Sequence, residues 1–496
     1  MKRTFLITGG VLALASIATM RSIPGQGGDL PVLHWVTDPH PARVEQIATY
    51  YEWLDRHDYP RMQVFLDAAN AEITKKLIQG VSGVGGEIVD CNRAKRDLLV
   101  FHGVGMLEDV TDEAQALGFS TDQTYPSMEE AITVDGRQFG FPRNVSTFMF
   151  WVNRQTFDNL GMKQPPQVWD WAEFERVGKE FVARANAGAN RTPAFFLLPD
   201  QTDQMALPVV MMRGLGQSLF NETMTASTLD DPRTIEVLET IHRWTFEERL
   251  LPTAADRASF TTSSGFGGPA LQLFREGRVG MVMMGRYALL QLRRFDEPLQ
   301  LAVSEPPAER YRNTLIMGGI SSVYAGAENK ELAAYFLAYL ASEGYNMQIV
   351  RDADGLPPNP RFTETEAFLR PPEHPNEWGV HEVFANAAKE IAIPYDYNEF
   401  ILPTATSRIL DSHYEAFMNG LIDAPTAAYR MQRDLDAEIQ RNLRDRPQLA
   451  EKHARLLAAQ REIDALKQAG EPVPASLLRN PYHLALQRRA DTPRAE

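Results

Sequence analysis

The chain has 496 residues, 44% of them hydrophobic, and its 65 acidic and 50 basic side chains give a formal net charge of -15. A chain of this length and apolar content can form two or three domains with their own cores, which excludes a disordered or fibrous protein. An acidic surface repels polyanions, so the composition also predicts no nucleic-acid partner.

Residues 1–22 are typical of a signal peptide or an N-terminal anchor. Lys2 and Arg3 precede an apolar run over residues 5–20, small residues near its end offer cleavage sites, and Arg21 follows directly. The run is shorter than the roughly 20 residues of a spanning helix, yet an uncleaved anchor stays open as an alternative to a cleaved signal. Both alternatives predict an exported, periplasmic protein.

Residues 30–142 alternate predicted strands with predicted helices. Short apolar runs at 31–36, 62–66 and 87–90 are typical of buried strands, and apolar residues at helical spacing predict helices at 44–54 and 73–79. This alternation favours a parallel sheet with helices on both faces. The sequence therefore predicts an α/β fold.

Cys91 is the only cysteine in the chain, which excludes an intramolecular disulfide and a thiolate-rich metal site. Its position after a predicted strand favours a packed side chain over a nucleophile. The sequence also lacks an H-E-x-x-H zinc motif and a G-x-S-x-G nucleophile elbow. We therefore predict no metal site, no cofactor and no catalytic residue.

Several motifs follow one another in a fixed order. They are G-V-G-M-L-E-D-V-T at 103–111, F-G-F-P at 139–142, W-V-N at 151–153, P-P at 165–166, W-D-W-A-E-F at 169–174, F-R-E-G-R-V-G-M at 274–281, G-R-Y at 285–287, G-G at 318–319 and G-L-P-P at 355–358. In this order they closely resemble the bacterial extracellular solute-binding proteins, the family that includes the maltose-binding proteins of ABC importers. The chain departs from the family pattern at Trp151 (usually Tyr), Val168 (usually Thr) and Tyr287 (usually Trp).

The resemblance covers roughly residues 30–442 and implies a two-lobe periplasmic-binding-protein fold of type II. Each lobe is expected to hold a mainly parallel sheet flanked by helices, with several crossings at a hinge. The implied boundaries place residues 30–142 and 286–342 in one lobe and residues 143–285 and 343–442 in the other. Residues 443–496 form a C-terminal helical extension, expected either to pack on the second lobe or to dock a partner.

The resemblance also implies a function and a set of partners. A receptor of this family closes its hinge on a small ligand, here expected to be a carbohydrate, and delivers it to the membrane permease subunits of an ABC transporter. It is expected to act as a monomer.

Ligand contacts are expected at strand ends and crossings, where the lobes meet. Sugars need flat aromatic surfaces and planar polar groups, because a buried hydroxyl without a partner costs about 1 to 3 kcal/mol. The predicted ligand-binding residues are Trp35, Thr37, Asp38, Asn92, Arg93, Arg143, Asn144, Gln201, Asp203, Gln204, Ser264, Gly265, Phe266, Arg286, Tyr287, Gly318, Gly319 and Trp378. Each has a structural alternative; Trp35, for example, suits a core position equally well.

Two other classes of protein remain open from the sequence. An exported glycoside-acting enzyme would need a pair of carboxylates about 5 to 9.5 Å apart, which any large acidic chain supplies by chance. A ligand-sensing or scaffolding protein would use residues 443–496 as its contact with a partner.

Overall fold

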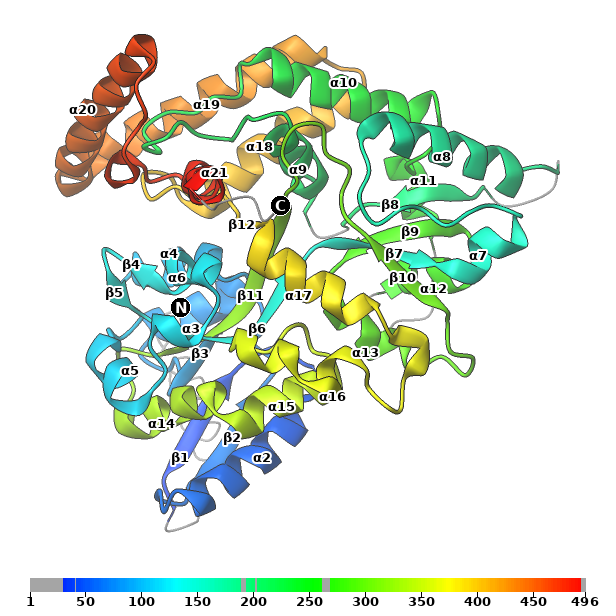
Figure 1. Cartoon of the computed structure of the whole chain (residues 1–496). Coiled ribbons are helices and arrows are strands. Elements are labelled where there is room, and N and C mark those ends of the chain that lie inside the picture. The colour runs from blue at the N-terminus through cyan, green and yellow to red at the C-terminus, as the bar shows by residue number, and fades with distance from the viewer. Residues whose placement is uncertain (1–29, 41, 189–192, 201–202, 261–267, 492–496) are drawn as a thin grey trace, which may run out of the picture.

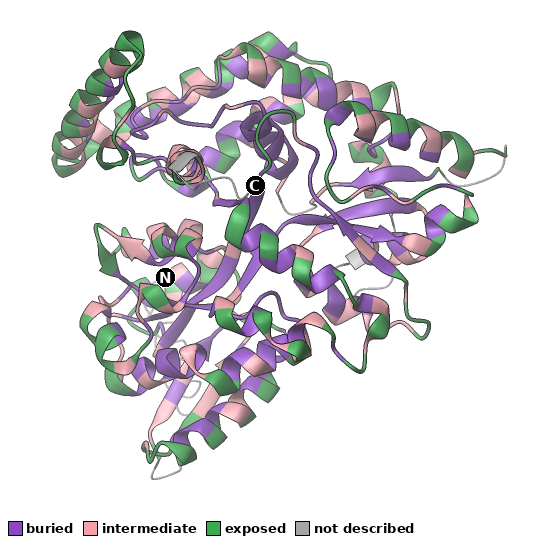
Figure 2. Cartoon of the chain, in the orientation of Figure 1, coloured by how far each residue is buried: buried purple, intermediate pink, exposed green. Residues whose placement is uncertain are grey.

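Two large β-sheets organise the chain in the computed structural model, which describes residues 30–40, 42–188, 193–200, 203–260 and 268–491. We call the six-stranded sheet with its helices lobe one, and the four-stranded sheet with its helices lobe two (Figure 1). Figure 2 shows that the strands of both sheets are largely buried.

The sheet of lobe one has the order β12-β11-β3-β1-β2, and β6 pairs with β11 as well. Its strands are β1 (Val32–Val36), β2 (Gln63–Asp67), β3 (Ile88–Cys91), β6 (Phe141–Thr147), β11 (Thr314–Val323) and β12 (Ala392–Pro394). β1 is parallel to β2 and β3, as the alternation of strands and helices predicts. β11 is antiparallel to β3 and β6, so the sheet is mixed.

The sheet of lobe two has the order β10-β7-β9-β8. Its strands are β7 (Met149–Asn153), β8 (Phe195–Leu198), β9 (Val279–Met284) and β10 (Leu301–Ser304). β7 is antiparallel to both neighbours, and only β8 and β9 pair in parallel. The expectation of a mainly parallel sheet is therefore wrong for lobe two. β7 pairs with β9 and β10, which lie more than 100 residues further along the chain, so the local alternation of strands and helices does not set its direction.

The predicted lobe boundaries are wrong in four places. Residues 143–147, assigned to the second lobe, belong to β6 in the sheet of lobe one. β10 lies within 286–342 but pairs with β7 in lobe two. Within 343–442, β12 pairs with β11 in lobe one, and α15 (Glu343–Asp352) adds Tyr345 and Ile349 to the core around Trp35. The chain thus changes lobes more often than the sequence motifs indicate.

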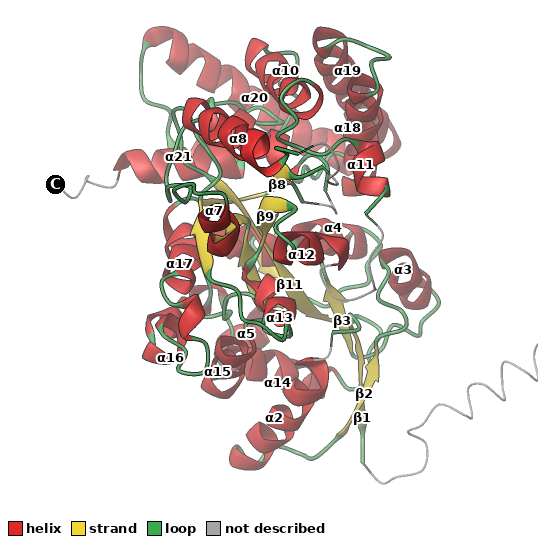
Figure 3. Ribbon diagram, turned by 90° about the vertical axis from the view of Figure 1, so that its right-hand side faces the viewer, coloured by secondary structure: helices red, strands yellow, loops and turns green. Residues whose placement is uncertain are grey.

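Helices cover both sheets (Figures 1 and 3). Those of lobe one are α2 (Ala42–Arg56), α3 (Ile73–Val81), α4 (Lys95–His102), α5 (Thr111–Leu117), α6 (Pro126–Ile132), α14 (Lys330–Ala341) and α15. Those of lobe two are α7 (Arg154–Asn159), α8 (Trp171–Ala185), α9 (Ala206–Gly214), α10 (Pro232–Phe246), α11 (Ala254–Ala258), α12 (Gly268–Arg275), α18 (Pro403–Met418) and α19 (Ala424–Asp445). Short helices near the crossings are α13 (Leu289–Leu292), α16 (Glu366–Leu369) and α17 (Val380–Glu390). Among the described residues, no helix combines the length and apolar character needed to cross a bilayer.

Aromatic residues fill the core between α8 and the sheet of lobe two. Trp169 and Trp171 are 5% and 7% exposed, and Phe174 packs on Trp244 with ring centroids 4.5 Å apart. Asp170 caps α8 by accepting a hydrogen bond from the backbone N–H of the third helical residue at 2.8 Å. The W-D-W-A-E-F motif therefore starts a helix and anchors it in the core.

The C-terminal extension contains α20 (Pro447–Ala469) and α21 (Pro481–Asp491), and both pack on lobe two. Tyr482 and Asn480 are fully buried, and they bond the backbone carbonyls of Arg213 and Phe220 at 2.8 Å. Near the start of α20, Lys452 pairs with Glu399 at 2.6 Å and with Asp135 in lobe one. Asp135 lies in the turn of a small hairpin of lobe one, between β4 (Thr133–Val134) and β5 (Arg137–Gln138). The extension thus contacts both lobes.

Candidate functional site between the lobes

The lobe-one side of the site rests on a buried network around Asp38, which follows β1. Asp38 accepts hydrogen bonds from Arg43 at 3.1 and 3.2 Å and from Arg143 at 2.9 Å. Both arginine side chains are almost fully buried, whereas the Asp38 side chain is 26% exposed. Two guanidinium groups therefore fix one accessible carboxylate in a defined orientation.

Asp90 forms the buried end of this network. It is fully buried, lies 3.1 Å from Nε of Arg143, and also accepts hydrogen bonds from Thr37 and from Ser321 at 2.6 Å. Burial raises the pKa of Asp90, while its hydrogen-bond donors oppose that shift. Thr37 and Arg143, both predicted as ligand contacts, are thus buried and support the carboxylates.

Asn144 lies at the hinge, on the strand that crosses into lobe two. Its side-chain amide nitrogen donates to Asp354 at 2.9 Å, and its side-chain oxygen accepts a hydrogen bond from the backbone N–H of Gly319 at 2.9 Å. A Cβ at the neighbouring Gly318 would lie 2.3 Å from the carbonyl oxygen of Asn144, so only glycine fits there. The predicted Gly318–Gly319 pair therefore allows β6 and β11 to approach closely, and both glycines are buried.

Two predicted ligand residues lie in the interior instead. Trp35 has no exposed surface: its Nε1 donates to Asp90 at 3.0 Å, and its ring packs on Phe336. Arg286 is 1% exposed and bonds His381 at 3.0 Å and the carbonyl of Gly355 at 2.7 Å. These two side chains hold the crossings together, and neither presents a surface to a ligand.

On the lobe-two side, Asp203 lies between β8 and α9. Burial raises its pKa to about 6; the backbone N–H of Met205 and the charge of Arg93 oppose the shift, while Asp200 and Asp411 reinforce it. Arg93 follows β3 in lobe one, so its influence on Asp203 acts across the two lobes. Its neighbouring helix α4 contacts α18 of lobe two, and Figure 3 shows these helices next to each other.

Two tyrosines interact with this carboxylate, and a third interacts with its neighbours Asp200 and Arg93. Tyr395 and Tyr397 follow β12, their rings stack with centroids 5.1 Å apart, and both interact electrostatically with Asp203. Tyr287 follows β9 and interacts with Asp200 and Arg93. Burial raises the pKa of all three phenols, so they remain neutral hydroxyls at physiological pH.

The remaining predicted residues fall into three groups. Asn92 accepts a long hydrogen bond from Arg143 at 3.4 Å, and Gln204 donates to Glu415 at 2.9 Å, so both lie near the facing surfaces. Trp378 is 48% exposed and precedes α17, which lies across the sheets from α4 in Figure 3. The structure therefore does not bring Trp378 to the site. Gln201, Ser264, Gly265 and Phe266 lie outside the described residues.

Tyr395, Tyr397, Asp354 and Asp411 are the site residues that the sequence analysis missed. The run Y-D-Y-N at 395–398 directly follows a buried strand, which is where polar and aromatic contacts are expected. This pattern could have identified Tyr395 and Tyr397 from the sequence. Asp411 lies inside a long helix, where its position toward lobe one depends on packing and cannot be found in the sequence.

Solved structures with the same arrangement of two lobes confirm the predicted fold class. The ABC substrate-binding protein Lmo0181 from Listeria monocytogenes, in complex with cycloalternan, superimposes with a TM-score of 0.68 at 18% identity, covering 84% of this chain and 99% of that one. UgpB from Mycobacterium tuberculosis, in complex with glycerophosphocholine, gives 0.67 at 16% identity over 84% and 100% of the two chains. The fold is that of a two-lobe, type II periplasmic binding protein.

Residues 94–376, more than half of the chain, match the family model described as bacterial extracellular solute-binding protein, and the chain belongs to this family. A putative binding protein of Brucella abortus (strain 2308) is 22% identical over 238 residues, which cover 48% of this chain and 54% of the relative. The chain thus spans about half the length of the curated relatives that it matches. The predicted family membership is confirmed.

Proposed function

We propose that the protein is an extracytoplasmic receptor that captures a carbohydrate-type ligand between its lobes and delivers it to the permease of an ABC transporter. The observation that carries the proposal is the stacked pair Tyr395 and Tyr397, with ring centroids 5.1 Å apart, which interacts with Asp203 of lobe two near Arg93 of lobe one. Family membership supports the receptor role.

The chemistry of these groups favours a sugar. Aromatic rings offer flat apolar surfaces for the C–H faces of a sugar ring, while carboxylates and guanidinium groups bond its hydroxyls. The site also holds Asp200 and Asp411, whose negative charges would repel a phosphate group. A neutral carbohydrate therefore suits this site better than a phosphodiester of the kind bound to UgpB.

Closure would occur at the crossings β6–β7, β10–β11 and after β12. A ligand stabilises the closed state when it contacts both lobes at once. Asp203 of lobe two and Arg93 of lobe one can provide such contacts. The proposed ligand-binding residues are Asp38, Asn92, Arg93, Asn144, Asp203, Gln204, Tyr287, Tyr395, Tyr397 and Asp411.

Thermal-shift screening tests this proposal. A ligand that binds only the folded state raises the melting temperature by mass action, so we expect a shift with at least one of maltose, maltotriose, cycloalternan, acarbose or tagatose. Glycerophosphocholine should give none. The substitution Tyr397→Ala should weaken binding of the best sugar at least tenfold in calorimetry, whereas Tyr429→Ala, which removes a 52% exposed ring on α19, should not. Stabilisation by glycerophosphocholine alone would overturn the carbohydrate assignment.

The proposal also places the protein in the periplasm, either free or held by an uncleaved N-terminal segment, as a monomer. It assigns no catalysis, in keeping with relatives that are described as binding proteins. Incubating the best sugar with the protein and analysing it by mass spectrometry separates the two classes: unchanged sugar is expected, and a cleaved product would indicate the glycoside-acting enzyme.

A further inference from the structure

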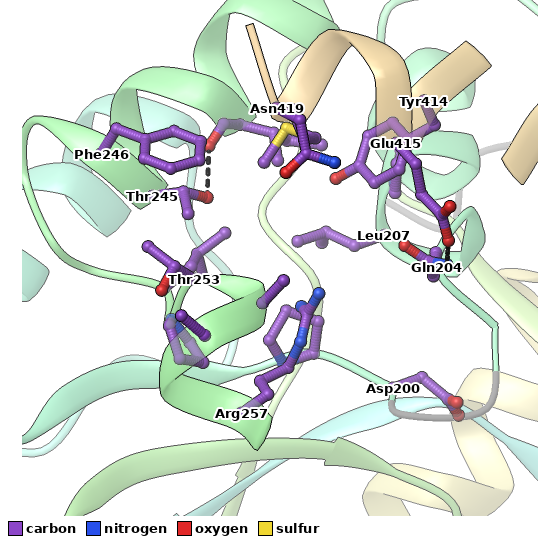
Figure 4. Close-up of a pocket in the computed structure, with 18 residues that line it drawn as sticks. Asp200, Gln204, Leu207, Thr245, Phe246, Thr253, Arg257, Tyr414, Glu415 and Asn419 are labelled. Carbon is purple, nitrogen blue, oxygen red and sulfur yellow. Dashed lines mark hydrogen bonds between the residues drawn. The ribbon is translucent and has the colours of Figure 1, made fainter. Parts of the chain in front are cut away.

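Lobe two contains a cavity of about 250 Å³ that shares Asp200 and Gln204 with the proposed site and otherwise lies outside it. Its walls come from the loop between β8 and α9 and from helices α9, α10, α11 and α18 (Figure 4). Asp200 and Gln204 form the side next to Asp203, so the cavity adjoins the interlobe site. It is built within one lobe and does not require closure to form.

The floor of this cavity is apolar. Leu207, Ile241 and Leu251 are each 2% exposed, and Pro208 and Met418 line the cavity beside them. These side chains cannot form hydrogen bonds, so a sugar ring placed on them would lose the bonds of its hydroxyls to water without replacement. The floor therefore favours a group without hydroxyls.

Most polar groups of the wall already bond one another. Gln204 donates to Glu415 at 2.9 Å, and the hydroxyl of Thr245 donates to the carbonyl of Ile241 at 2.8 Å. Thr253 forms a capping box with Asp256 at the start of α11. They therefore add little capacity to bind a polar ligand.

Tyr414, Arg257 and the exposed Asn419 differ from these groups. Within the described ranges, neither the Tyr414 hydroxyl nor the Arg257 guanidinium forms a hydrogen bond, although the two groups interact electrostatically. Figure 4 shows Arg257 reaching in from α11 and Tyr414 from α18, with Leu207 between them. The Tyr414 hydroxyl and the Arg257 guanidinium thus lie on either side of Leu207, at the edge of the apolar floor.

The size of the cavity limits what it can hold. Pockets that enclose a whole drug-sized ligand have volumes of about 300 to 1,000 Å³, so about 250 Å³ suits one ring-sized group. We propose that this pocket receives an apolar, ring-sized substituent of the ligand, an aryl or compact alkyl group. The sugar part would lie between the lobes, and the linking oxygen would face Tyr414 and Arg257. The assignment of the sugar part rests on the proposed function.

The pocket is tested without any sugar by titrating 4-fluorophenol and observing its fluorine NMR signal. We expect saturation with a Kd of about 1 to 10 mM, which is the range open to so small a molecule. The substitution Ala255→Trp should weaken binding at least tenfold, because Ala255 is exposed on α11 and lines the pocket. The matched control Ala258→Trp lies exposed on the same helix outside the pocket and should change the Kd by less than twofold.

A second variant, Tyr414→Phe, keeps the ring and removes the hydroxyl, and it should weaken 4-fluorophenol binding about three- to tenfold. Absence of saturation in the unmodified protein, or equal binding by the Ala255→Trp variant, would overturn the pocket assignment even if sugars bind.

The phenyl glycoside of the best sugar should then bind at least tenfold more tightly than the sugar itself, and Ala255→Trp should remove this gain. If 4-fluorophenol binds but no sugar binds, the pocket assignment stands and the carbohydrate function is rejected. Equal affinity for the sugar and its phenyl glycoside would reject the pocket.

Discussion

Replacing Asp203 by asparagine is expected to weaken binding of the best sugar about 10- to 100-fold while making the unliganded protein more stable. The affinity falls because hydrogen bonds to a charged group contribute about 1.5 to 3 kcal/mol, and the amide has one acceptor oxygen instead of two. The fold should survive, since the asparagine oxygen can still accept the backbone N–H of Met205, which bonds Asp203 at 2.9 Å.

The gain in stability follows from the raised pKa. The pKa of Asp203 is about 6 in the folded protein, above its value of 3.8 in a free side chain, because burial disfavours the charged form. The folded state therefore holds this proton more tightly, and stability is lost as the pH rises from about 4 through 6. Asparagine carries no charge, so Asp203→Asn should add about 1 to 3 kcal/mol at pH 7.5 and nothing at pH 4.

The protonation of Asp203 also determines the expected pH dependence of sugar binding. Sugar affinity should fall as the pH drops below about 6, because protonated Asp203 loses its strong acceptor, and the Asp203→Asn variant should show a flat profile. Asp230→Asn, which neutralises an exposed carboxylate elsewhere in lobe two, is the control and should change neither property. Unchanged affinity in the Asp203→Asn variant would remove this residue from the binding site.

Replacing Arg213 by methionine is expected to reduce the free energy of unfolding by about 3 to 5 kcal/mol. Arg213 and Asp396 form a salt bridge at 2.6 Å, and the side chains of both are fully buried. Arg213 also donates to the carbonyls of Ile393 and Pro394, which ties α9 to the last crossing strand. Without the arginine, Asp396 keeps a buried charge whose remaining hydrogen-bond donors, within the described part of the chain, are the hydroxyl of Ser218 and the backbone N–H of Leu219.

Urea denaturation measures this loss. The comparable Arg233→Met substitution breaks the pair between Arg233 and Asp231, whose side chains are 42% and 25% exposed, and should cost under about 1 kcal/mol. A loss below 1 kcal/mol for Arg213→Met would mean that solvent reaches Asp396 or that the pair contributes little to stability.

The local patterns of the chain predict much of the fold. The strands predicted at 31–36, 62–66 and 87–90 and the helices predicted at 44–54 and 73–79 follow from apolar spacing, and the motif order predicts the two-lobe fold. The positions of β10 and α15 do not, because a four-residue strand or a ten-residue helix with one apolar side fits either lobe equally well. Their placement depends on partners that are distant in the sequence.

The site was predicted less completely than the fold. Strand ends predicted Asp38, Asp203 and Tyr287, which lie at the candidate site. An arginine at such a position does not reveal whether it faces solvent or bonds buried carbonyls, as Arg286 does. Trp35 fits the same pattern and lies in the core, because its indole N–H finds Asp90 there.

Small-angle X-ray scattering with and without the best sugar tests the central claim most directly. A receptor whose lobes close on its ligand should show a smaller radius of gyration when the sugar is added. The contraction should saturate at the concentration that saturates binding, and at this sugar concentration it should be absent in the Asp203→Asn variant. Tight sugar binding with an unchanged scattering curve would contradict closure of the lobes around the ligand.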